Sequence, residues 1–230
     1  MTGGDLRGIS SMATRQILAE LVEAYRAKSG RTVAIESVGG VDAARRVREG
    51  EAFDVVVLAD DALAKLEAEG HLAAGTRTGF TLSALAVATR AGTPPLVFAD
   101  EQAVRDALLA AATIGYSTGP SGTYLLNLVK RWGIDETIAP KLRQAPPGVP
   151  VGTMVARGDA EIGFQQTSEL LGVAGIDLAG PLPPAVAFET LFAAAVGAHA
   201  GDPDTARDFV VWLASPETTD CKRRNGMEPA

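Results

Sequence analysis

Residues 53–58 read FDVVVL, a run of apolar and β-branched side chains that predicts a central strand of a sheet. Asp60 and Asp61 follow this strand and are expected to cap a helix over residues 62–69. Short β-branched runs alternate with helical patterns in both directions from this point. We therefore predict an α/β fold whose sheets contain mostly parallel strands flanked by helices.

Two long apolar segments predict how the chain is divided. Residues 78–89 (TGFTLSALAVAT) and 185–197 (AVAFETLFAAAVG) both have the pattern of extended strands. If each one crosses between two lobes, residues 1–80 and 189–230 form lobe I, and residues 81–188 form an inserted lobe II. Such an arrangement predicts a cleft and a hinge at the two crossing strands.

Composition excludes several classes of function. The 230-residue chain has a formal net charge of -7, which disfavours binding to nucleic acids or anionic membranes and points to a small ligand. Cys221 is the only cysteine, and the two histidines, His71 and His199, lie in unrelated contexts. The sequence therefore predicts no metal site, no histidine-based catalytic triad and no cofactor.

The first residues, MTGGD, lack the charged and apolar regions of a signal peptide. The chain as written is therefore expected in the cytoplasm, or in the periplasm if a leader has been removed. We expect a monomer, which would work with an ABC transporter permease if the protein is exported.

Small polar residues precede four of the predicted helices. They are Ser10-Ser11, Gly39-Gly40, residues 117–123 (STGPSGT) within the stretch YSTGPSGTYLLNLV, whose helix is expected to start near Tyr124, and residues 146–153 (PPGVPVGT). For one loop alone, ordinary helix capping explains such residues. Four together, at strand ends that an open α/β sheet brings to one crevice, predict an anion site built from backbone N–H groups.

Five segments carry a resemblance to a known family. ISSMATRQILAELVEAYRAKSG, GGVDAARRVREGEAFDVVVLADD, PSGTYLLNLVKRWG, MVARGDAEIGF and SPETTDCKRRNGMEP resemble the molybdate-binding-like branch of type II periplasmic solute-binding proteins, in the same order along the chain. The resemblance implies two α/β lobes that close on a tetrahedral oxyanion. In that family backbone amides, two serines and a tyrosine hydroxyl hold the oxyanion.

The sequence departs from that pattern at the implied ligand positions. Ala13 stands where the first serine is expected, so that Ser10, Ser11 or Thr14 must substitute; the second serine cluster is replaced by Gly39-Gly40-Val41. Ser121 matches an alanine whose amide contributes, and Gln166 falls near the tyrosine. The implied pocket is roomier and offers both donors and acceptors.

A related branch, similar in its SSMAT and IGFQQ stretches, contains aconitate isomerase-like proteins, which makes an organic polycarboxylate a candidate ligand beside molybdate. The predicted function is capture of a small anion; the alternatives are an isomerase that shifts an allylic proton or a cytoplasmic sensor of a carboxylic acid. The titratable groups nearest the loops are Asp60, Glu169, Arg15 and Tyr124, and no catalytic residue is assigned.

Because neighbours on a strand face opposite ways, we expect only one of the two glutamines to reach the ligand. The predicted ligand-binding residues are Ser10, Ser11, Thr14, Gly39, Gly40, Ser121, Gly122, Thr123, Tyr124, Gly152, Thr153, Gln165 and Gln166.

Overall fold

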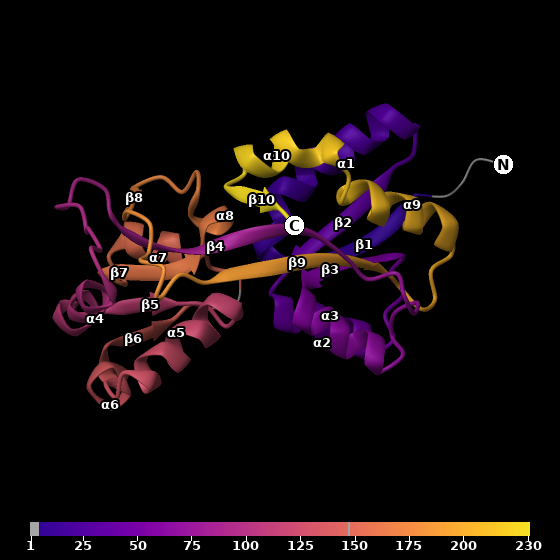
Figure 1. The fold of residues 1–230 in the computed structure, drawn as a ribbon. Helices are drawn as coiled ribbons and strands as arrows, with labels where there is room; N and C mark the ends of the chain where they lie inside the picture. The colour runs from indigo at the N-terminus through magenta and orange to yellow at the C-terminus, as the bar shows by residue number, and fades with distance from the viewer. Residues whose placement is uncertain (1–4, 147) are drawn as a thin grey trace. The chain divides into compact units, whose positions relative to one another are not determined.

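The computed structural model describes residues 5–146 and 148–230 (Figure 1). Residue 147, which belongs to the predicted PPGVPVGT loop, and residues 1–4 lie outside the described residues. The chain divides into two compact units: the residues up to Ser83 together with Leu191–Ala230, and Ala84–Thr190. We call them unit 1 and unit 2. The predicted lobe boundaries differ from these by a few residues.

Unit 1 contains a sheet in the order β2-β1-β3-β9, in which β1 is parallel to β2 and β3, and β3 is antiparallel to β9. Its strands are β1 (Leu6–Ser11), β2 (Val33–Val38), β3 (Val55–Ala59), β9 (Glu189–Val196) and β10 (Met227–Pro229), the last pairing with the start of β4. Its helices are α1 (Arg15–Ser29), α2 (Gly40–Arg48), α3 (Asp60–Ala68), α9 (Pro203–Leu213) and α10 (Thr219–Arg224).

Helices cover both faces of this sheet: α1, α9 and α10 lie on one face, and α2 and α3 on the other (Figure 1). Every residue of β3 is buried. Val55 and Val57 belong to the core under α1 and α9, whereas Val56 and Leu58 belong to the core under α2 and α3. The prediction of a central strand at FDVVVL is therefore confirmed, because both faces of the strand are covered.

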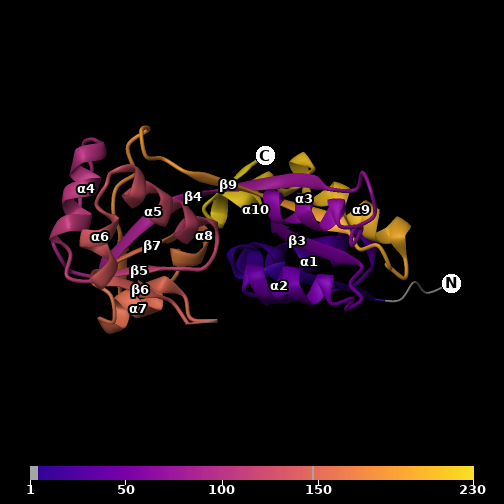
Figure 2. The ribbon, with the colours of Figure 1, turned by 90° about the horizontal axis from the view of Figure 1, so that it is seen from below.

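Unit 2 contains a smaller sheet in the order β4-β7-β5-β6, in which β5 is parallel to both of its neighbours. Its strands are β4 (Thr78–Arg90), which begins in unit 1, β5 (Ile114–Tyr116), β6 (Leu142–Gln144), β7 (Ile162–Gln166) and β8 (Ile176–Leu178). Its helices are α4 (Glu101–Ala110), α5 (Pro120–Arg131), α6 (Asp135–Ile138), α7 (Val151–Arg157) and α8 (Thr167–Leu170). Figure 2 shows α4, α5 and α6 on one face of this sheet and α7 on the other.

Three local predictions are wrong. Helix α5 begins at Pro120 rather than near Tyr124, because proline at the first helical position has its φ angle already set for a helix. Asp60 lies inside the first turn of α3, after an Ala59 N-cap, and its carboxylate pairs with Arg77. Residues 185–188 lie outside β9, which begins at Glu189. A 3-10 turn, Met12–Thr14, precedes α1.

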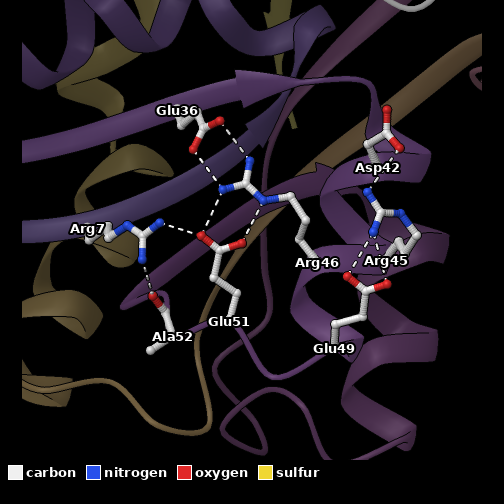
Figure 3. A network of polar contacts seen from close by, with 8 residues as sticks. All are labelled: Arg7, Glu36, Asp42, Arg45, Arg46, Glu49, Glu51 and Ala52. Atoms are coloured by element: carbon white, nitrogen blue, oxygen red, sulfur yellow. Dashed lines mark hydrogen bonds and ion pairs between the residues drawn. The ribbon is translucent and has the colours of Figure 1, made fainter.

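Most of the charge on unit 1 is held in surface ion pairs, and the largest group surrounds Arg46 (Figure 3). Its guanidinium contacts Glu36 at 2.7 Å and Glu51 at 2.7 Å, and Arg7 pairs with the same Glu51 carboxylate. Hydrogen bonds from Arg46, with a further one from Arg7, lower the pKa of Glu51 to about 2. The guanidinium carbons of Arg7 and Arg46 lie 4.6 Å and 5.4 Å from the centre of the Phe53 ring. This network joins α2 to the strands and is expected to weaken in salt.

One charged side chain is buried without an ion pair. Lys222 in α10 is 1% exposed, and its ammonium lies 5.8 Å from the centre of the Phe80 ring. No hydrogen bond or salt bridge joins this ammonium to another residue in the described ranges. Burial in these apolar surroundings lowers the pKa of Lys222 to about 8. Protonated Lys222 is therefore a destabilising element of unit 1.

This leads to a prediction about pH. Because the pKa of Lys222 is lower in the folded than in the unfolded chain, its destabilisation is complete below about pH 8 and disappears as the pH rises toward the ordinary value of 10.5. Lys222→Met should raise Tm by several degrees at pH 6.5 and by much less at pH 10.5. Scanning calorimetry at both pH values measures this difference.

The control is Lys65→Met, which removes an exposed lysine from α3. It should leave Tm almost unchanged at both pH values. An equal or negative Tm shift for Lys222→Met at the two pH values would contradict the assignment.

Candidate functional site

In unit 1 the predicted residues gather at the carboxyl ends of β1 and β2. Ser10 is opposite Ser37 in the parallel register, and their hydroxyl oxygens are 2.7 Å apart. Ser11 follows at the N-cap of the 3-10 turn, is 7% exposed, and its Oγ has no hydrogen-bond partner among the described residues. A Cβ placed on Gly40 would lie 3.6 Å from the Cβ of Ser11, so the loop after β2 borders this serine.

Thr14 supports this turn from the inside. It is fully buried, and its hydroxyl donates to the carbonyl oxygen of Ser11 at 3.1 Å. Since that hydroxyl is used within the turn, Thr14 positions Ser11. The free Ser11 hydroxyl is the group in this loop that can still bind a ligand.

In unit 2 the carboxyl ends of the parallel strands β5, β6 and β7 share one edge of the sheet. The N-terminus of α5 follows β5, and the N-terminus of α7 follows β6. Gln165 and Gln166 end β7. The topology therefore brings together the unit 2 residues that the sequence predicted, as expected for parallel strands.

The two glutamines differ in how their amides are used. Gln165 accepts from the Val151 N–H at 2.8 Å and donates to Glu169 at 2.8 Å, so it ties β7 to α7 and α8. Gln166 is 1% exposed and donates to Thr190 Oγ1 at 2.6 Å. Its Oε1 has no partner among the described residues. Of the pair, Gln166 is therefore the one with an open polar atom.

The first turn of α5 packs tightly on the loop before it. Ser121 is 1% exposed, and its hydroxyl lies 3.1 Å from that of Ser117. A Cβ on Gly122 would lie 1.7 Å from the carbonyl oxygen of Ser117, which leaves no room for any side chain. Gly122 therefore allows the close approach that places the helix end beside its loop.

The remaining predicted residues of unit 2 have structural contacts. Gly152 faces apolar side chains of α8 and β8, and a Cβ there would lie 3.1 Å from Leu170 and Ile176. Thr153 donates its backbone N–H to Pro150. Thr123 is exposed. Tyr124 donates its hydroxyl to Val186 at 3.1 Å and stacks on Phe188, and desolvation raises its pKa.

Helix N-termini differ sharply across the described structure. Asp100 caps α4 and Asp202 caps α9 through side-chain hydrogen bonds. α2 and α3 have acidic residues in their first turns. By contrast, α1, α5 and α7 have no acidic residue in the first turn and no side-chain hydrogen bond from the N-cap. Within the described ranges, these are the three helices of seven or more residues that lack both features, and at α7 the Val151 N–H is bonded instead by Gln165 of β7.

Two residues at these strand ends were missed by the sequence analysis. Ser37 bonds Ser10, and Ser117 bonds Ser121. Both end or follow a strand, and that position was the available signal. The contact of Ser37 with Ser10 depends on the register of two parallel strands, which the sequence alone did not give.

The described residues contain no cluster of three or more His, Cys, Asp or Glu side chains suited to a metal ion. None of the described helices is both long enough and apolar enough to cross a membrane. Among the titratable groups considered from sequence, Asp60 is paired with Arg77, and Glu169 accepts a hydrogen bond from Gln165. Whether the two units share one ligand stays a prediction.

Comparison with known proteins gives the class to which this protein belongs. Residues 6–228 match the bacterial extracellular solute-binding protein family, and the chain belongs to it. The fold is the α/β type II periplasmic-binding-protein fold of molybdate- and sulfate-binding proteins. The predicted family and fold are therefore confirmed.

Particular relatives come from both branches expected from sequence. An aconitate isomerase of a Pseudomonas species is 33% identical over 96% of this chain and 86% of its own length. The periplasmic molybdate-binding protein of Azotobacter vinelandii has a TM-score of 0.80 at 19% identity, over 97% of this chain and 98% of that one. The sulfate-binding protein SubI of Mycobacterium tuberculosis H37Rv also has a TM-score of 0.80, at 16% identity, over 99% and 88% of the two chains.

The close packing at α5 predicts a contrast between two glycines. Gly122→Ala should destabilise unit 2 by about 3 kcal/mol, because the methyl group overlaps the Ser117 carbonyl and the helix end must move. Gly119→Ala should cost less than about 1 kcal/mol, since its nearest neighbour would be Ser117 Oγ at an ordinary 3.5 Å. Urea unfolding of both variants measures the contrast. Equal stabilities for the two variants would show that Gly122 is not needed for this approach.

Proposed function

We propose that this protein captures a small anion at helix N-termini, those of α1 in unit 1 and of α5 and α7 in unit 2. The observation that carries the proposal is that these helices, which the sequence predicted as binding elements, have no hydrogen bond from an N-cap side chain and no acidic residue in the first turn. Each helix N-terminus carries roughly half a positive charge and unpaired N–H donors. An anion can therefore be held without lysine or arginine.

Each unit also has an open polar atom that supports the proposal. The Ser11 hydroxyl stands just before α1, and a hydroxyl can donate to an anionic oxygen. Gln166 Oε1 stands at the end of β7, next to the strand that leads to α5. A buried polar atom without a partner is destabilising, so a ligand that satisfies either atom gains affinity from it.

The loop after β2 is expected to contribute less to the attraction of an anion. Asp42 lies in the first turn of α2, and its carboxylate is near the position that a Gly39 side chain would take. A negative charge there opposes an anion. Gly39 and Gly40 are therefore proposed to leave space beside Ser11, and the attraction comes from α1.

The open acceptor favours an organic acid over a fully ionised inorganic oxyanion. Molybdate and sulfate offer acceptors only, whereas the carbonyl oxygen of Gln166 needs a donor, such as a hydroxyl group or a protonated carboxyl group. The 33% identical relative, an aconitate isomerase, supports an organic acid as the ligand. A small polycarboxylate is thus the preferred ligand, and molybdate is the alternative.

A thermal-shift series tests the proposal. Molybdate, tungstate, sulfate, citrate and cis- and trans-aconitate are added separately; a bound anion at about 100 times its dissociation constant should add roughly 2.7 kcal/mol of stability. Ser11→Ala should weaken the best anion by about tenfold, the loss expected for one hydrogen bond to a charged group. Ser29→Ala, at the far end of α1, is the matched control and should bind normally. No Tm shift with any anion would exclude the proposal.

The relative's name supports a second candidate function, an isomerase that moves an allylic proton of a carboxylic acid. Such an enzyme needs a base near the carbon acid. If the chain is an isomerase, incubation with trans-aconitate should yield the cis isomer, measured by chromatography. Binding of aconitate without turnover would leave the solute-binding role alone.

As a solute-binding protein, the chain would deliver its ligand to an ABC transporter permease, and that role implies a location outside the cytoplasmic membrane. A cytoplasmic location would instead support the isomerase or sensor alternative.

A further inference from the structure

A groove beside the α1 half of the site has no role in anion capture by backbone groups. It lies between α1 and the edge strand β2 and encloses about 110 Å³. Its lining is Arg15, Leu18, Ala19, Val22, Ile35 and Ser37. The lining is thus four apolar side chains with one cation and one hydroxyl at the end of the groove nearest the start of α1.

Arg15 is the charged member of this lining and the first residue of α1. Its side chain is exposed, and no hydrogen bond or ion pair joins the guanidinium to any other residue in the described part of the chain. Most other arginines of unit 1, such as Arg7, Arg46 and Arg77, pair with carboxylates. The groove therefore has a positive charge that the protein itself does not neutralise, and none of its lining residues is acidic.

The groove is continuous with the binding loop. Ser37 lines the groove, and its hydroxyl is 2.7 Å from that of Ser10, which directly precedes Ser11. Arg15 directly follows the 3-10 turn that Ser11 begins. Ser11 and Arg15 are therefore four residues apart, on either side of this turn.

We propose that this groove is a second carboxylate subsite, in which Arg15 binds one carboxylate of an organic di- or tricarboxylate and the hydrocarbon part lies against Leu18, Val22 and Ile35. The inference rests on the proposed function, because the first carboxylate is the anion held at the N-terminus of α1. A planar guanidinium suits a carboxylate through paired N–H donors. The apolar lining favours binding of a short carbon chain and adds no binding free energy for an inorganic oxyanion.

The subsite therefore determines specificity. A tetrahedral oxyanion fills only the part at the helix N-terminus, whereas a polycarboxylate is bound at both ends. The length between the two carboxylates then becomes a property that the protein can discriminate. This goes beyond anion capture, because it names the groove that takes the second carboxylate and the residue that selects it.

Isothermal titration of the full chain tests the subsite, with citrate, tricarballylate, acetate and molybdate as probes. Arg15→Gln should weaken tricarballylate and citrate by about 10- to 100-fold, the loss expected for charge-assisted hydrogen bonds, and should change molybdate affinity by less than about threefold. Ala19→Glu, an exposed position in the same lining, should weaken the tricarboxylates by repulsion. Arg26→Gln, on the same helix outside the groove, removes the same charge and should bind all probes normally.

The outcomes separate the two proposals. If Ser11→Ala weakens tricarballylate while Arg15→Gln and Ala19→Glu bind it as the unaltered protein does, the groove proposal is overturned and anion capture stands. An equal loss in Arg15→Gln and Arg26→Gln would assign the effect to net charge and also overturn the subsite. Molybdate binding tighter than that of every carboxylate would overturn it as well. If the unaltered protein binds none of the probes, anion capture itself fails.

Discussion

The parallel pairing of neighbouring strands is the constraint on which the rest of this structure depends. When parallel strands end at one edge, the helices that follow them must begin there, and their unpaired N–H groups gather at that edge. In unit 1 the pairing of Ser10 with Ser37 fixes this edge, and in unit 2 the pairing of β5 with β6 and β7 does so. The proposed attraction of an anion would thus be a consequence of topology, and the side chains would only refine it.

The distribution of charge fits this arrangement. The chain is acidic, with a formal net charge of -7, yet α1, α5 and α7 have no acidic residue in their first turns. Elsewhere carboxylates are used for structure: Glu51 and Glu36 hold Arg46, and Asp100 caps α4. An acidic protein can therefore attract an anion locally, because the field at a helix end falls off within about one turn.

In the proposed site, the choice between an inorganic and an organic anion depends on a few side chains. The Ser11 hydroxyl serves either class, whereas the open Gln166 carbonyl and the unpaired Arg15 in an apolar groove favour a larger ligand that has donors and more than one carboxylate. These residues stand around a fold shared with molybdate- and sulfate-binding proteins. Specificity can thus change from metal oxyanions to organic acids while the helix ends that attract charge stay in place.

Much of this protein could be predicted from its sequence. The FDVVVL strand, the helices after the glycine- and serine-rich loops, and the family were all correctly identified, because hydrophobic periodicity and local turn chemistry act over short distances. The start of α5 and the role of Asp60 were not predicted correctly. The role of Asp60 depends on its partner Arg77, which is distant in sequence.

Contacts between distant segments decided several further features. Ser37 meets Ser10, and Arg15 borders a groove. Gln165 is used within unit 2, whereas Gln166 keeps an oxygen without a partner. The sequence by itself determined the elements and their order; only the tertiary structure decided which polar atoms were left without partners, because that depends on strand register and packing across the sheet.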